Sequence, residues 1–300
     1  MKRIKRTLAL LLACLLLVGC GGTAESSEHT APEEIVEALP ETAPAKPISA
    51  PAVVTEGQAP EKAYELPTEV MSLQSWVEDQ AERPDVAVCL LAEDPEKAAA
   101  LYLVEENSER TLLIRWEDSL AEFSWSPGGP LLADPQFQCW DVDSDGQDEV
   151  IVINSIGSGT GVSVDELHVV EKSQDGTLTD NCFPAPLWQD DLSGLLSVAV
   201  TGDRTYAILG TELVDITADA AYGDPETLQY GTGSIANFSA SPPAEASGGV
   251  LSFRGAFLIA WEGHPSGAYV ADTTADISYE NGTFTLSEFH LDSNQSTRKE

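Results

Sequence analysis

The sequence predicts a mainly β fold of antiparallel sheets, arranged as a sandwich or a partial propeller-like fold, with one N-terminal helix. Three observations support this prediction. Short runs rich in β-branched and aromatic residues recur between turn residues from position 86 to position 291. One amphipathic pattern with helical spacing precedes them at residues 68–83. Asn281-Gly282 separates the last two runs, and this dipeptide is the strongest short-range signal of a β-hairpin.

Residues 1–19 have the organisation of a secretory signal peptide. Basic residues at positions 2–6 precede an apolar run at 8–18, which is shorter than the roughly 20 residues that span a bilayer. The LVGC sequence at residues 17–20 resembles the bacterial lipobox, a cleavage site whose cysteine becomes lipidated. This resemblance implies that Cys20 begins the mature chain and anchors it to the extracytoplasmic face of the cell membrane. An ordinary secretory signal that happens to contain a cysteine is the alternative.

Residues 20–66 are expected to form a disordered stalk. The stretch 21–67 contains seven prolines, nine glutamates and a single aromatic residue, Tyr64. A segment of this composition buries too little apolar surface to offset the entropy of ordering. Proline and like charges also stiffen it, so the stalk should hold the folded domain away from the membrane.

Residues 67–292 are sufficient for one β-rich globular domain, and residues 293–300 form a polar tail. In the predicted helix at residues 68–83, Thr68 is the expected N-cap, and Leu73 and Trp76 share an apolar face. Residues 186–195 are a possible second helix. The sequence contains no repeat of fixed period, which argues against a complete propeller.

Three cysteines remain in the folded region after the signal peptide and the lipidated residue: Cys89, Cys139 and Cys182. An exported protein could bridge two of them and leave one thiol, or all three could be buried and free. No CxxC motif and no Cys/His spacing indicates a zinc site.

An acidic loop at residues 141–149 is the strongest candidate for a binding site. It holds five acidic side chains directly before the apolar run VIVI. The pattern D-x-D-x-D-G-x-x-E places carboxylates at alternate positions, with Gly146 available for a sharp turn, and Ca²⁺ takes about six to eight oxygen ligands of this kind. An Asp/Gly turn with solvated charges is the alternative. The predicted ligands are the side chains of Asp141, Asp143, Asp145 and Glu149 and the backbone carbonyl of Gln147.

The acidic loop resembles the calcium loops of FG-GAP and VCBS repeats, which lie between β-strands. It is not an EF-hand, because Val152 stands at position twelve and a strand follows where a helix would leave. The resemblance covers residues 137–171 and, with the lipobox, extends to VCBS-type bacterial lipoproteins, many of them uncharacterised. The loop occurs once where those families often repeat it, and its ninth residue is Glu rather than the commoner Asp. The resemblance implies a bound Ca²⁺.

Net charge and missing motifs narrow the classes of function. The chain has 15 Lys+Arg against 50 Asp+Glu, a formal net charge of -35, which repels nucleic acids at long range. No G-x-S-x-G, H-E-x-x-H or Walker motif is present, so the chain is not expected to be an enzyme. A secreted carbohydrate- or cell-wall-active hydrolase with an unidentified carboxylate pair is the alternative.

The sequence therefore predicts a membrane-anchored extracytoplasmic lipoprotein with a structural calcium loop, acting as a surface binding or interaction module. Its ligand would be a glycan or a protein, and the sequence does not identify it. Trp188 and Trp261, near predicted loops, could stack on sugars or belong to the core. His168 and His290 alternate with apolar neighbours and are expected to face outward from their strands.

Overall fold

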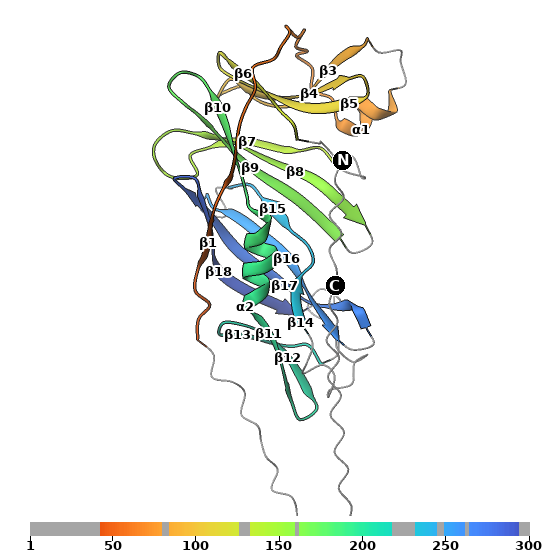
Figure 1. Cartoon of the computed structure of the whole chain (residues 1–300), viewed down its shortest axis with the longest axis vertical. Helices are drawn as coiled ribbons and strands as arrows, with labels where there is room; N and C mark the ends of the chain where they lie inside the picture. The colour runs from red at the N-terminus through yellow and green to blue at the C-terminus, as the bar shows by residue number, and fades with distance from the viewer. Residues whose placement is uncertain are drawn as a thin grey trace, which may run out of the picture. The chain divides into compact units, whose positions relative to one another are not determined.

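The computed structural model describes residues 43–79, 84–125, 133–159, 162–217, 232–244, 249–261 and 264–293. These residues form four antiparallel sheets (Figure 1), which confirms the predicted mainly β fold. They all fall within one compact unit, Glu37–Glu300.

The five-stranded sheet carries the acidic loop and is covered by a hydrophobic core on each face. Its strands follow the order β2-β10-β9-β8-β7. Along β8, Ile151 and Ile153 belong to one core, whereas Val150 and Val152 belong to the other. Successive side chains of a strand point to opposite faces, so the VIVI run is buried on both. The strands are β2 (Val53–Glu56), β7 (Gln136–Trp140), β8 (Glu149–Gly159), β9 (Val162–Lys172) and β10 (Leu178–Cys182).

A four-stranded sheet of consecutive hairpins shares one of these cores. Phe123 and Trp125 pack in it together with Val150 and Val152 of the five-stranded sheet. The short helix α1 (Leu73–Glu78) closes this core with Leu73. The strands of the sheet are β3 (Val86–Asp94), β4 (Ala99–Glu106), β5 (Glu109–Trp116) and β6 (Ser119–Phe123).

A six-stranded and a three-stranded sheet share the other core. Phe253, Phe257 and Phe284 of the larger sheet pack there with Ala207 and Leu209 of the smaller one. The six-stranded sheet contains β1 (Ile48–Pro51), β14 (Thr232–Ile235), β15 (Ser239–Ser241), β16 (Leu251–Trp261), β17 (His264–Glu280) and β18 (Thr283–Ser293). The three-stranded sheet contains β11 (Leu196–Thr201), β12 (Arg204–Leu209) and β13 (Glu212–Asp215).

The predicted Asn-Gly hairpin is confirmed between β17 and β18. Glu280 pairs with Thr283, which leaves a two-residue turn. Asn281 and Gly282 have φ angles of 49° and 72°. Positive φ at both central residues is what a type I′ turn requires, and its twist matches that of the flanking strands.

The N-terminal helix is shorter than predicted. Val70 forms a bridge with Leu90, and the Met71 N–H donates to the Leu90 carbonyl at 2.9 Å, so the chain before the helix is extended. Ser72, rather than Thr68, caps the helix by accepting a hydrogen bond from the Ser75 N–H. Pairing with β3 therefore delays the start of the helix. Residues 80–83 of the predicted helix lie outside the described residues.

The second predicted helix is confirmed, but most of it is a π-helix instead of an α-helix. Residues 187–195 begin as a π-helix, η1 (Leu187–Leu192), and end as α2 (Ser193–Leu195). Trp188 is buried against Phe238 in the larger core, and Trp261 is buried in the same core. Neither tryptophan is available for sugar stacking, so their second interpretation, as core residues, is the one that the structure supports.

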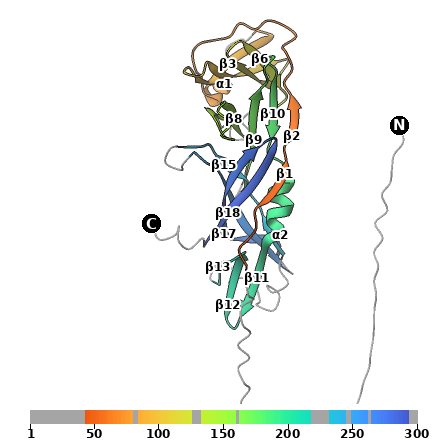
Figure 2. The same cartoon turned by 90° about the vertical axis from the view of Figure 1, so that its left-hand side faces the viewer.

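Residues 43–66 are not disordered, so the predicted stalk is wrong for this part of the chain. β1 pairs with β18, β2 pairs with β10, and Gln58 forms a bridge with Glu122 in β6. Figure 2 shows β1 and β2 following one another beside β18 and β10. At the other end, a side chain on Gly210 would lie 2.3 Å from the Ala45 nitrogen. Residues 45–58, here called the N-terminal strap, thus contact all four sheets.

Composition missed the N-terminal strap because the strap is held by backbone pairing and by a few partly buried side chains, Ala45, Ile48, Ala50 and Ala52, that pack on the larger core. All four residues of β2 are exposed, so they bury little apolar surface. Both strands lie at sheet edges, where a proline such as Pro51 is tolerated because one side of the strand needs no donor. Residues 20–42 of the predicted stalk and residues 294–300 of the predicted tail lie outside the described residues.

Candidate metal centre

The acidic loop joins β7 to β8 at the end of the five-stranded sheet. Trp140 pairs with Glu149, so the loop closes a β-hairpin. Ser144 and Gly146 have φ angles of 61° and 91°, which turn the chain back on itself. A Cβ on Gly146 would meet nothing within 4 Å, so this position favours glycine for its backbone conformation rather than for lack of space.

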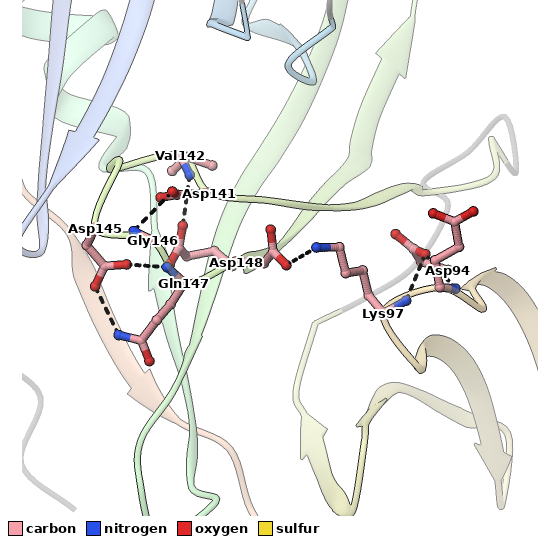
Figure 3. Close-up of polar contacts among 10 residues, drawn as sticks. Asp94, Lys97, Asp141, Val142, Asp145, Gly146, Gln147 and Asp148 are labelled. Carbon is pink, nitrogen blue, oxygen red and sulfur yellow. Dashed lines mark hydrogen bonds and ion pairs between the residues drawn. The ribbon is translucent and has the colours of Figure 1, made fainter.

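Three of the predicted ligands come together in the loop. Side-chain oxygens of Asp141, Asp143 and Glu149 all lie within 4.8 Å of one another. Asp145 is turned elsewhere: its carboxylate accepts from the Gln147 N–H at 2.7 Å and from Gln147 Nε2 at 3.1 Å, as Figure 3 shows. The structure therefore gathers a triad of carboxylates and uses Asp145 and Gln147 to shape the turn beside it.

Backbone N–H groups of the loop hold the triad in place. They donate from Gly146 to Asp141 Oδ2 at 3.0 Å, from Val142 to Glu149 Oε2 at 2.9 Å and from Asp145 to Asp143 Oδ1 at 3.1 Å. The other carboxylate oxygen of Asp141, Oδ1, is buried and has no hydrogen-bond partner among the described residues. A buried acceptor without a partner costs free energy, and a cation would remove that cost.

The electrostatics of the loop favour positive charge. Burial raises the pKa of Glu149 to about 7, and the carboxylates of Asp143, Asp145 and Asp141 add to this rise, while the hydrogen bond from Val142 opposes it. Burial also raises the pKa of Asp143, although the Asp145 N–H opposes that shift. Both shifts mean that the loop disfavours its own negative charges.

The acidic loop also borders a polar groove of about 1020 Å³. The other walls come from the β3–β4, β5–β6, β9–β10 and β17–β18 turns. Both lysines that line the groove are ion-paired, Lys97 with Asp148 (Figure 3) and Lys172 with Glu117. No pattern in the sequence predicts this groove, because its walls are far apart along the chain.

The triad could hold a metal ion. Its donors are all carboxylate oxygens, which suit hard cations such as Ca²⁺, Mg²⁺ and Mn²⁺ better than soft ones. The other predicted site residue, Cys20, lies outside the described residues. In the part of the chain that is described, no helix is both long and apolar enough to cross a membrane.

Comparisons with known proteins identify no relative of this chain. No protein-family model, curated protein or solved structure matches it. The function must therefore be inferred from the geometry of the site and from the sequence patterns around it.

Proposed function

We propose that the acidic loop binds Ca²⁺ and that the chain is a lipid-anchored extracytoplasmic binding module stabilised by this ion. The triad of Asp141, Asp143 and Glu149 carries the proposal, because its oxygens already lie within 4.8 Å of one another. Asp141 Oδ1 is buried without a hydrogen-bond partner among the described residues, and Glu149 is buried, so both would gain from a compensating positive charge. A divalent cation would supply it for all three carboxylates at once.

Calcium fits the loop better than magnesium. Three carboxylates supply only part of the coordination shell, and the rest would come from the backbone of the turn and from water. Ca²⁺ accepts about six to eight oxygens in irregular geometry, whereas Mg²⁺ demands near-octahedral ligands and gives up its water reluctantly. A turn that offers three carboxylates and leaves the other ligands to backbone and water therefore favours Ca²⁺.

The stabilisation by calcium should be modest. Extracellular calcium modules have dissociation constants of about 10⁻⁴ to 10⁻³ M. At a free concentration of about 1 mM this range corresponds to about 0.4 to 1.4 kcal/mol of added stability. The calcium site is then a structural element of the domain, and the adjoining groove is the surface where we place a glycan or protein ligand.

The hydrolase alternative receives less support from the same geometry. A retaining carboxylate pair is separated by about 5–5.5 Å, and an inverting pair by more, to leave room for water. One oxygen from each carboxylate of the triad lies within 4.8 Å of the others, so the triad gathers three carboxylates around one point instead of holding a single pair apart. Turnover of a polysaccharide or of peptidoglycan that is lost in Glu149→Gln would reverse this ranking.

The calcium proposal is tested by thermal unfolding of the full chain in calcium and in chelator. The wild type should melt a few degrees higher in about 1 mM Ca²⁺, with a smaller rise in Mg²⁺. The double variant Asp141→Asn with Asp143→Asn should fold and lose the calcium response. Asp203→Asn, an acid in the β11–β12 turn, is the matched control and should keep the response. Identical wild-type melting in calcium and chelator, with no heat of binding at millimolar metal, would refute the site.

The anchor is tested separately by mass spectrometry of the membrane fraction. The mature protein should begin at Cys20 and carry lipid there, and Cys20→Ala should release it from the membrane. An unmodified, secreted wild type would rule out lipid anchoring while leaving the calcium site untouched.

A further inference from the structure

A buried polar cluster, centred on His168, lies on the face of the five-stranded sheet opposite the larger core. His168 was expected to face outward, but its side chain is only 2% exposed. Its Nδ1 lies 3.1 Å from both carboxylate oxygens of Asp180 on the neighbouring strand β10. Asp180 is buried as well. We call His168, Asp180, Glu166 and Cys182 the His168 cluster.

The imidazole ring of His168 is fixed in both position and orientation. Its ring stacks on the indole of Trp125 with centroids 4.0 Å apart. The same tryptophan donates from Nε1 to Asp180 Oδ2 at 2.9 Å. Trp125 therefore also positions the carboxylate that contacts the imidazole. Burial lowers the pKa of His168, but the neighbouring Asp180, Cys182 and Glu166 outweigh this and raise it well above its usual range. A metal ion at Nε2 would therefore displace a proton.

Nε2 is buried and has no hydrogen-bond partner among the described residues. The nearest carboxylate oxygen, Glu166 Oε2, is 3.7 Å away, too far for a hydrogen bond. Cys182 lies directly across from His168 in the β9–β10 register, and its side chain contacts the imidazole. A nitrogen, an oxygen and a sulfur donor therefore lie near one another, and no group in the described structure satisfies the nitrogen.

We propose that His168 Nε2, the Glu166 carboxylate and the Cys182 thiolate bind a borderline-soft divalent metal ion of the Zn²⁺ class. Imidazole, thiolate and carboxylate are the ligands that Zn²⁺ takes in tetrahedral sites, and three protein ligands leave the fourth position to water. Asp180 is a positioning residue: metal-bound histidines commonly donate their other ring N–H to a carboxylate.

Charge and access both suit such an ion. A thiolate and a carboxylate match the charge of a divalent cation, and binding releases the thiol proton and the proton on Nε2. Among the described residues only the acidic loop has three ligand atoms within 4.8 Å of one another, so the Glu166 or Cys182 side chain must turn to close the new site. The Glu166 side chain is 38% exposed and can do so. Val53, opposite Cys182 at the sheet edge, is 56% exposed and leaves an approach.

The test is a Co²⁺ titration of the reduced full chain, because a cobalt–thiolate bond gives a charge-transfer absorption that oxygen ligands do not. The wild type should develop this band at one equivalent of metal and lose it when Zn²⁺ is added. Cys182→Ala should abolish the band, Glu166→Gln should weaken it, and Asp180→Asn should lower affinity by about 10- to 100-fold. Since Glu166 is partly exposed, its variant tests the site even if the Asp180 variant fails to fold.

Two controls separate this site from the acidic loop and from stray metal binding. The Asp141→Asn, Asp143→Asn variant should keep the cobalt band, and Cys182→Ala should keep the calcium response, so either site can fail alone. A band that persists in Cys182→Ala would place the thiolate at another cysteine of the chain and overturn the proposal. No band, or equal weak binding by all variants, would mean an adventitious ion only and would also overturn it.

Discussion

The acidic loop and the His168 cluster belong to the same five-stranded sheet, and each leaves one buried polar atom without a partner, Asp141 Oδ1 and His168 Nε2. The loop takes its carboxylates from nine consecutive residues and offers only oxygen. The cluster draws on two paired strands and offers nitrogen, oxygen and sulfur. One sheet thus carries a candidate site for a hard cation at its end and the proposed softer site on its face.

The two regions also differ in how far they are stable without metal. In the loop, carboxylates face one another, and burial raises the pKa of Glu149 to about 7. In the cluster, the Asp180 carboxylate is satisfied by both Trp125 and His168. Without metal, removing a carboxylate charge from the acidic loop should therefore stabilise the protein, whereas removing Asp180 from the His168 cluster should destabilise it.

The largest effect is expected for Asp180→Ala measured in chelator. The change leaves His168 Nδ1 and Trp125 Nε1 buried without their acceptor, and breaking a buried charged pair costs about 3–5 kcal/mol. Urea unfolding should show this loss as a lower midpoint with an unchanged slope. A loss of less than about 1 kcal/mol in the free energy of unfolding would show that the Asp180 contacts contribute little to stability.

The opposite sign is expected for Glu149→Gln in chelator at pH 8. Glutamine can still accept from the Val142 N–H but carries no charge, so stability should rise by about 1–2 kcal/mol. Because the folded-state pKa of Glu149 is raised, metal-free wild type should gain stability as pH falls from 8 through about 7. The variant should lack this gain, and an identical pH dependence in both proteins would contradict the interpretation.

A matched glycine pair sharpens the contrast between the acidic loop and an ordinary turn. Gly146 and Gly202 both have positive φ, and an added Cβ would meet nothing within 4 Å at either. Gly146→Ala and Gly202→Ala should each cost about 1–2 kcal/mol through backbone strain alone. Only Gly146→Ala should also lower calcium affinity, because a backbone shift away from φ 91° would move the N–H that donates to Asp141. Calorimetry would distinguish them, and equal calcium binding by both variants would count against the loop geometry.

The smallest effect is expected for Asp175 in the β9–β10 turn, whose carboxylate accepts hydrogen bonds from residues of the same turn. Its carboxylate accepts from the Ser173 hydroxyl and the Thr177 N–H, which lower its pKa to about 2. A lowered folded-state pKa gives stability that is present above the unfolded pKa of about 4 and lost as pH falls through about 2. Asp175→Asn should therefore be slightly less stable than wild type at pH 6, with the difference vanishing near pH 2. A difference in stability between variant and wild type that persists near pH 2 would mean that the substitution acts through the hydrogen-bond geometry of the turn and not through the charge of Asp175.

The parts of the structure that the sequence predicts are those set by neighbouring residues. Alternating and continuous apolar runs predicted strands such as β8, and Asn281-Gly282 predicted the last hairpin because φ preferences are local. The carboxylates of Asp141, Asp143 and Glu149 were likewise predicted as ligands from spacing alone.

The parts that escaped prediction depend on pairing between distant segments. Trp125, which follows β6, stacks on His168 in β9, and no periodicity encodes that contact. The N-terminal strap resembles a disordered stalk in composition, since its order comes from edges that other strands provide. Asp145 was predicted as a ligand, but its spacing could not show that Gln147 would occupy its carboxylate.

The pairing of the N-terminal strap with β18 can form only late in folding. Ser49 and Thr285, joined by hydroxyl groups 2.7 Å apart, are separated by 236 residues, so the first strand of the chain pairs with the last. A chain that emerges N-terminus first must leave β1 unpaired until β18 has been delivered. Contacts of such long sequence separation slow folding and prolong the exposure of open edges. The chain therefore reaches its full set of pairings only after release of its C-terminal hairpin, and a truncation before Thr283 should leave the strap with no β18 edge to join.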